Sequence, residues 1–304
     1  MIMQKKSYRF ELLFMLGFLF TLVAAFGTFF LGFKMGITQA EAKYAHLTNL
    51  PGFETTASYE QQDLVAYYYV VFQPYEQFKH EYFGLVDQLR SSDSRVKSIG
   101  IMKDIRNASR KQYEQIQAQT ITVSSPLLQD AQSDVLKSLK LFDESTSRIE
   151  IGSKNGAQLA KLLAEDEFTN NAEQYGLKAQ QKYYTSMMKW AAKSNKSIPS
   201  DVVFKENTSI KEWAAYPLAV KNKIVSDLMV SSNLYVSYLP QDMTAKIDQM
   251  IDSGKAGSMK LNSVNSIVNV LMDTEAVQGK EFLKWKSAYY ATEFLPEVPF
   301  FSEQ

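Results

Sequence analysis

Two serine–lysine pairs have the spacing at which a helix brings an amine next to a hydroxyl nucleophile. Ser186 precedes Lys189 and Ser94 precedes Lys97, so both segments match the S-x-x-K pattern. A chain this rich in serine and lysine contains about two such matches by chance, and the K-T-G element that accompanies the motif is absent. We therefore expect no catalytic residues here and no enzymatic activity.

A histidine and two carboxylates suggest metal chemistry more weakly. Glu76 and His80 are one helical turn apart, and Asp87 follows two turns later. These positions lie outside the apolar face of the predicted helix, which favours a solvated surface over a metal site. No H-E-x-x-H pattern occurs, and the other histidine, His46, is distant in the sequence. We predict no metal ligands.

The remaining chemical signals are also weak. The acidic run over residues 165–167 could serve acid–base chemistry if a carboxyl were desolvated, but such a run is more often a water-facing helix end. Glycines occur without a phosphate-binding pattern, and the absence of cysteine excludes disulfides and thiolate metal sites. With 33 basic and 33 acidic residues, the chain gives no electrostatic reason to expect nucleic acid. No cofactor is predicted.

The elements that would carry any function begin with an apolar segment near the N-terminus. Residues 12–33 are uncharged, and three cations precede them: Lys5, Lys6 and Arg9. At about 1.5 Å of rise per residue, a helix of this length crosses the roughly 30 Å hydrocarbon core of a bilayer. We predict a retained transmembrane signal anchor after a short cytoplasmic leader over residues 1–11.

Cleavage after Ala42 is the competing interpretation, because Ala40, Glu41 and Ala42 have the A-x-A form. That site lies too far from the apolar core to be favoured. Only Lys34 and Lys43 closely follow the apolar segment, so the balance of cations places the N-terminus in the cytoplasm. The rest of the chain is then expected to be an extracytoplasmic body on a single-pass membrane protein.

Small side chains recur every four residues along the predicted anchor, at Ala24, Thr28, Gly32 and Gly36. This spacing places them on one helix face, where another helix could approach closely. Glycine and alanine are also common in membrane helices without any contact role. We take these four positions as candidates for self-association or for contact with a partner helix.

The body is predicted to be all-α. An apolar seam with alternating spacings of four and three residues runs through Leu64, Tyr68, Val71, Tyr75, Phe78, Tyr82, Leu85 and Leu89. Its many aromatic residues suit a globular core better than a coiled-coil dimer. Pro74 lies inside the seam and should break or bend that helix. Later segments repeat the helical pattern, so we expect a multi-helix bundle or array.

N-cap residues and prolines predict where several helices begin. Ser125 before Pro126 is typical of a helix start, and Ser209 with Glu212 forms a capping-box pattern. Only residues 120–123 and 148–151 resemble short strands. Residues 34–56 are predicted to be a stalk, and residues 57–304 the helical domain. A subdivision near residues 121–126 is possible, although one continuous array explains the same pattern.

Two features mark possible contact surfaces in the body. Tyr67, Tyr68 and Tyr69 are consecutive and cannot all point toward one core, so some must meet a second helix, the membrane interface or a partner. The apolar tail over residues 294–301 contains two prolines that exclude a regular helix. We expect the tail to pack back onto the bundle, with presentation to another protein as the alternative.

The sequence thus favours a non-enzymatic, membrane-anchored protein whose extracytoplasmic helical domain scaffolds or regulates a cell-envelope complex. Its expected partners are the membrane and either another protein or a second copy of the chain. The alternative is a ligand-sensing or ligand-binding domain with a cavity between helices, for a ligand that the sequence does not identify. An envelope hydrolase is a third possibility, for which no polar constellation is evident.

Overall fold

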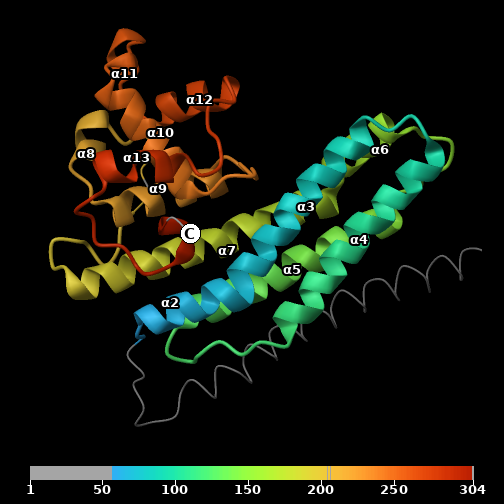
Figure 1. The fold of residues 1–304 in the computed structure, drawn as a ribbon, viewed down its shortest axis with the longest axis horizontal. Helices are drawn as coiled ribbons and strands as arrows, with labels where there is room; N and C mark the ends of the chain where they lie inside the picture. Colours follow the sequence, from blue (N-terminus) through green and yellow to red (C-terminus); the bar gives the residue numbers. More distant parts are fainter. Residues whose placement is uncertain (1–56, 204, 206, 303–304) are drawn as a thin grey trace, which may run out of the picture. The chain divides into compact units, whose positions relative to one another are not determined.

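The computed structural model describes residues 57–203, 205 and 207–302, which belong to one compact unit beginning at Ala57. The elements, in chain order, are α2 (Gln61–Tyr67), the π-helix η1 (Tyr68–Phe72), α3 (Gln73–Arg90), α4 (Arg95–Gln117), α5 (Pro126–Arg148), α6 (Gly156–Glu165), α7 (Glu167–Ser194), α8 (Ile210–Ala214), α9 (Leu218–Ser231), α10 (Pro240–Asp252), α11 (Lys255–Ser258), α12 (Val264–Asp273), α13 (Glu281–Tyr289) and the 3-10 helix η2 (Pro299–Phe301) (Figure 1).

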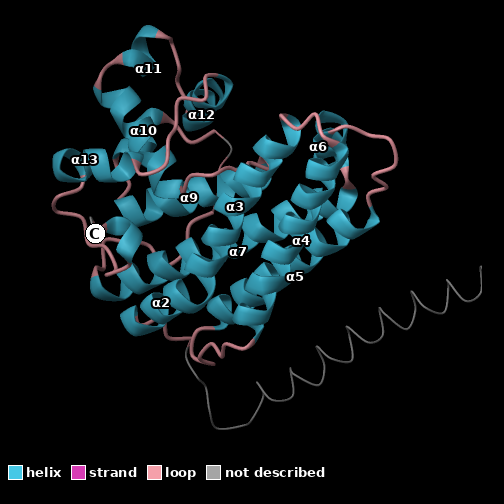
Figure 2. Ribbon diagram, turned by 45° about the vertical axis from the view of Figure 1, so that its right-hand side comes forward, coloured by secondary structure: helices cyan, strands magenta, loops and turns pink. Residues whose placement is uncertain are grey.

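The predicted all-α class is confirmed for the described part of the chain. Figure 2 shows helices and loops there without strands, and the only bridge between extended segments joins Ser209 to Ser263. Of residues 120–123 and 148–151, which resembled strands, Arg148 ends α5 and the others lie in the connections after α4 and α5. The predicted anchor over residues 12–33 and the stalk over residues 34–56 lie outside the described residues. Within the described ranges, no helix has the length and apolarity needed to span a membrane.

The seam predicted along the first helix of the body packs into the core. Six of its eight side chains are buried, while Tyr68 and Leu85 are half-buried. Pro74 does not end the helix, so the break that was one of the two predicted outcomes does not occur. The π-helix precedes it, with the Gln73 N–H donating to the Tyr68 carbonyl, and Pro74 falls in the first turn of α3. Because η1 runs directly into α3 and Pro74 has no N–H, one backbone hydrogen bond is missing at this join, and the helix continues past it.

The long helices form a bundle of α2–η1–α3, α4, α5 and α7, which runs from the lower left to the upper right of Figure 1. The most extensive packing is between α5 and α7, and α4 packs against both α3 and α5. Rings meet at its centre, where Phe142 lies 4.6 Å from Tyr82 and 5.0 Å from Phe78 between ring centroids. Of residues 121–126, considered as a domain boundary, residues 121–125 lie in the connection between α4 and α5 and Pro126 begins α5.

Two helices begin where the capping serines and the proline in the sequence predict. α5 begins at Pro126 after Ser125, whose Oγ lies 2.8 Å from both the Ser58 carbonyl oxygen and Asp63 Oδ2. The predicted capping box also forms, because Ser209 Oγ accepts from the Glu212 N–H and Glu212 accepts from the Ser209 N–H. Each reciprocal cap satisfies backbone donors that would otherwise lack a partner.

The short helices α8 to α13 form a C-terminal lobe, which joins the bundle where α9 packs on α7. Asp248 on α10 holds this lobe together. Its carboxylate accepts hydrogen bonds from Trp213 Nε1 at 2.6 Å, Tyr290 OH at 2.6 Å and Lys221 Nζ at 3.0 Å. Hydrogen bonds from one charged and two aromatic side chains offset the free-energy cost of removing this carboxylate from water. It therefore fastens α8, α9 and the end of α13 to α10.

The C-terminal segment, residues 294–302, packs back onto the bundle, as expected. The Phe300 ring lies against Tyr68 at 5.7 Å, Phe72 at 5.6 Å and Tyr184 at 6.1 Å between centroids. Phe301 is buried against Phe282 of α13, at 5.5 Å. The segment thus joins the C-terminal lobe to the first helix of the body.

Candidate functional site

The serine–lysine pairs serve structural roles. Ser186 is buried and its hydroxyl donates to the Lys182 carbonyl at 2.8 Å, while Lys189 Nζ donates to the Ser200 carbonyl at 3.3 Å. Ser94 is the N-cap of α4, and its Oγ accepts from the Lys97 N–H. A serine nucleophile needs a base within hydrogen-bond reach, and these contacts direct both hydroxyls to the backbone instead.

The residues considered for metal binding are spread along α3. Glu76 pairs with Lys79 at 3.1 Å, Asp87 pairs with Arg90 at 2.9 Å, and His80 is exposed. Across the described ranges, no three potential ligands gather around one point. His80 and Asp87 lie on the solvated face that the sequence predicts, whereas Glu76 is half-buried beside an interior pocket.

The acidic run at residues 165–167 lies at the junction of α6 and α7. Asp166 is the N-cap of α7, and its Oδ2 accepts from the backbone N–H groups of Phe168 at 2.9 Å and Thr169 at 3.2 Å. Glu165 and Glu167 are exposed. Negative charge at a helix N-terminus is stabilising, so the run has a structural explanation.

The three tyrosines point to different places, as consecutive helical residues must. Tyr67 is buried against Tyr183, with ring centroids 4.7 Å apart, so it belongs to the core and we withdraw it from the candidate surface. Tyr68 is half-buried under Phe300. Tyr69 is 51% exposed. The anchor candidates Ala24, Thr28, Gly32 and Gly36 lie outside the described residues.

Tyr69 borders an open hollow of about 590 Å³ on the surface, which we call the Tyr69 hollow. The opposite wall comes from the end of α13 and the C-terminal segment. The lining residues are Tyr69, Lys286, Tyr290, Ala291, Glu293, Leu295, Pro296, Glu297, Val298, Pro299, Phe301 and Ser302. This wall is firmly placed, because Tyr290 bonds to Asp248 and Glu293 accepts from the Leu218 N–H at 3.2 Å. The hollow mixes aromatic, proline and charged side chains, as protein interfaces do.

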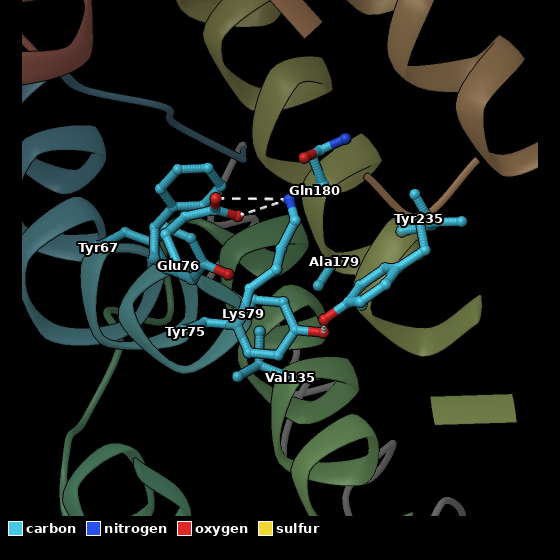
Figure 3. A pocket seen from close by; sticks show the side chains of 11 residues that line it. Tyr67, Tyr75, Glu76, Lys79, Val135, Ala179, Gln180 and Tyr235 are labelled. Carbon is cyan, nitrogen blue, oxygen red and sulfur yellow. Dashed lines mark hydrogen bonds and ion pairs between the residues drawn. The ribbon is translucent and has the colours of Figure 1, made fainter. Parts of the chain in front are cut away.

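Enclosed space in the bundle is much smaller. The pocket in Figure 3 lies between η1–α3, α5 and α7 and has a volume of about 10 Å³, enough for about one water molecule. Lys79 is buried at its edge and paired with Glu76. A second pocket, between α7, α9 and the C-terminal segment, is equally small. Neither pocket has room for an organic ligand.

Hydroxyl groups cross the pocket of Figure 3 and tie three elements together. Tyr75 OH lies 2.8 Å from Ser138 Oγ and 3.0 Å from Tyr235 OH. Burial raises the pKa of Tyr75, so the hydroxyl stays neutral. Gly176 faces this group, since a Cβ there would lie 2.0 Å from Tyr75 Oη. The network is a packed structural contact.

One carboxyl nearby has unusual electrostatics. Glu173 on α7 has its pKa raised from 4.5 to about 7, because burial disfavours the charged form. Its charge would also raise the pKa values of Tyr75 and Tyr82. No pattern in the sequence marked this residue, because its burial depends on how α7 packs against distant helices.

Comparisons with protein-family models, with curated proteins and with solved structures find no match. Function is therefore inferred from the residues and geometry of this chain.

Proposed function

We propose that this chain is a non-enzymatic, single-pass membrane protein whose extracytoplasmic helical body scaffolds or regulates an envelope complex through the Tyr69 hollow. The observation that carries the proposal is the difference in volume between the open hollow and the enclosed pockets. The open hollow of about 590 Å³ borders the exposed Tyr69, whereas two enclosed pockets among the described residues each measure about 10 Å³. Recognition at a surface is favoured over capture inside a cavity.

The composition of the hollow supports a protein partner. Tyrosine combines a large apolar ring with a polar tip and loses little side-chain entropy on binding, which makes it frequent in interfaces. Pro296 and Pro299 stiffen the facing wall, and Lys286 and Glu297 supply charge for orientation. A rigid wall limits the entropy lost on association. The apolar residues 12–33 would hold the hollow near other envelope proteins.

The proposal is tested by site-specific photo-crosslinking of the full-length protein in its native membrane. Tyr69 is replaced by p-benzoylphenylalanine, and Met259 is replaced in the same way as a control. The two sites are matched, because Tyr69 is 51% and Met259 49% exposed. We expect a reproducible adduct with one protein at position 69 and none at position 259.

A second variant shows whether the hollow itself binds. Glu297→Lys reverses a charge on an exposed lining residue and should weaken the adduct at position 69 without loss of helix content. Identical adducts from positions 69 and 259, or an adduct insensitive to Glu297→Lys, would count against the hollow. An adduct containing only a second copy of the chain would identify self-association as the form of the scaffold.

A further inference from the structure

The bundle has a distinct end at the start of α2, where three parts of the chain meet. The Ser58 N–H donates to the Ser124 carbonyl at 2.8 Å, which holds the connection between α4 and α5 beside residue 58. Lys193 Nζ donates to Glu60 Oε1 at 2.6 Å, which holds the last turn of α7 there. We call this region the α2 end. It lies where residues 34–56 join the body.

Large apolar side chains are exposed at the α2 end. Val123, next to Ser124, is 74% exposed. Phe294 is 44% exposed, with its ring stacked on Trp190 at 4.6 Å between centroids and an interplanar angle of 10°. Trp190 is one turn before Lys193, so Phe294 belongs to the same end of α7. A single exposed apolar residue needs no explanation, but here two such residues lie near the point where residues 34–56 join the body.

Cations accompany these side chains. Residues 189–200 contain Lys189, Lys193 and Lys196 and no acidic residue, and the carboxylates nearest to them in the fold or the sequence are Glu60, Asp63 and Asp201. Glu60 neutralises Lys193, and Lys196 is exposed. Lysines next to aromatic and aliphatic side chains suit the interface of a bilayer, because the apolar groups enter the headgroup region while the amines stay with anionic phosphates.

We propose that the α2 end is a membrane-facing surface, which rests on anionic lipid headgroups through Val123, Phe294 and the neighbouring lysines. This inference depends on the proposed anchor, because residues 34–56 connect that segment directly to this end. Tethering raises the effective concentration of the bilayer at the α2 end above that at any other part of the body. The contact would orient the body and present the Tyr69 hollow at a fixed height above the bilayer.

The opposite end of the bundle supplies a control. The helix from Gln61 to Arg90 spans about 45 Å at 1.5 Å of rise per residue, and α4 begins beyond its far end. Val96, in the first turn of α4, is 80% exposed. Val96 and Val123 are therefore the same residue type with similar exposure, at opposite ends of one bundle.

The test measures lipid contact at single positions in the full-length protein. The chain has no cysteine, so Val123→Cys, Phe294→Cys and Val96→Cys each give one site for a spin label. Each variant is reconstituted into vesicles of phosphatidylcholine alone or with phosphatidylglycerol. Accessibility to oxygen, which partitions into lipid, is compared with accessibility to a water-soluble nickel chelate. We expect labels at positions 123 and 294 to favour oxygen in the anionic vesicles, and the label at position 96 to favour nickel.

The lysine contribution is tested in the same samples. Lys189→Gln combined with Lys196→Gln should abolish the effect of phosphatidylglycerol on the label at position 123. Lys103→Gln combined with Lys111→Gln, on the exposed face of α4, should leave it unchanged. The first pair bears on the charge argument because neither lysine contacts a carboxylate in the structure within the described residues.

Three outcomes would overturn the membrane-facing surface. Labels at positions 123 and 294 that behave like the label at position 96 would place the α2 end in water. Low accessibility to both reagents would indicate burial against a second copy of the chain. Extraction of the protein by alkaline carbonate would remove the anchor and the surface together, whereas a carbonate-resistant protein with aqueous labels would reject the surface alone.

Discussion

Gly176 shows how tightly one residue position can be constrained. A Cβ at this position would lie 2.0 Å from Tyr75 Oη and 3.0 Å from the Tyr235 ring. We predict that Gly176→Ala displaces Tyr75 from its contacts with Ser138 and Tyr235 and lowers the free energy of unfolding by about 1–3 kcal/mol. Urea unfolding of the detergent-solubilised protein, followed by near-ultraviolet circular dichroism, measures the change.

Gly84 is the matched control, because it also lies inside a long helix. A Cβ at Gly84 meets no atom within 4 Å. Gly84→Ala should raise the free energy of unfolding by about 0.5–1 kcal/mol, since alanine restricts the unfolded chain and favours helix. Changes of opposite sign at the two glycines would support the steric argument, and stabilisation by both substitutions would refute it.

Glu173 gives the protein a defined pH dependence. Its pKa is 4.5 ordinarily and about 7 in the folded chain, so between these values the folded state holds a proton that the unfolded state has lost. Stability should therefore decline as the pH rises through this window. Glu173→Gln should remove the decline and increase stability at pH values above 7, as measured by thermal unfolding at a series of pH values.

Exposed Glu81 on α3 provides the comparison, and Glu81→Gln should leave the pH profile unchanged. Asp242 adds a separate decline in stability as the pH rises from 3.8 to about 6, because burial raises its pKa between these two values. The Glu173→Gln variant should retain that part of the profile. A profile identical to that of the unsubstituted protein would exclude Glu173 as its source.

At the scale of elements, periodicity predicted the helices but not the details of their joins. Alternating apolar spacings identified the seam from Leu64 to Leu89, and the N-cap serines identified the starts of α5 and α8. The π-helix at residues 68–72 was missed, because Pro74 alone indicates a break and no local pattern distinguishes a π turn. That turn helps to determine which of the three tyrosines faces outward.

The Tyr69 hollow could not be predicted from local patterns either. Tyr69 and Pro299 line the same hollow because α13 and the C-terminal segment pack beside the bundle, and the two residues are far apart in the sequence. The two prolines did mark the segment as irregular, and the exposed tyrosine did suggest a contact. Their juxtaposition depends on long-range packing, which single-sequence periodicity does not encode.

The C-terminal segment makes a testable contribution to stability. Phe300 lies among the rings of Tyr68, Phe72, Tyr183 and Tyr184. Phe300→Ala should lower the free energy of unfolding by about 3 kcal/mol, because truncation of a packed phenylalanine loses both transfer free energy and ring contacts. Chemical denaturation of the full-length protein provides the measurement.

Phe294→Ala is the control for this change. Phe294 is in the same segment, but it is 44% exposed and contacts one ring, that of Trp190. Its truncation should cost about 1 kcal/mol or less. Comparable losses from both substitutions would mean that the segment is not held mainly by Phe300.

For the whole molecule, the main prediction concerns the anchor. If Ala24, Thr28, Gly32 and Gly36 form a helix–helix contact, Gly32→Ile with Gly36→Ile should abolish association, because branched side chains prevent close backbone approach. Crosslinking yield in the membrane measures this association. Phe26→Ile alters another face of the same helix and should have no effect. Unchanged association in the double variant would remove these four positions from the proposed scaffold.

The packing of Phe300 against Tyr68 also has a consequence for biosynthesis. Translation produces the first helix of the body long before it produces Phe300, whose ring covers Tyr68 and Phe72. Domains often begin to fold during translation, so this chain must keep an aromatic surface uncovered until Phe300 has been made. A stop codon just before Phe300 would release a protein that retains helices α2 to α13 but exposes an aromatic surface on its first helix.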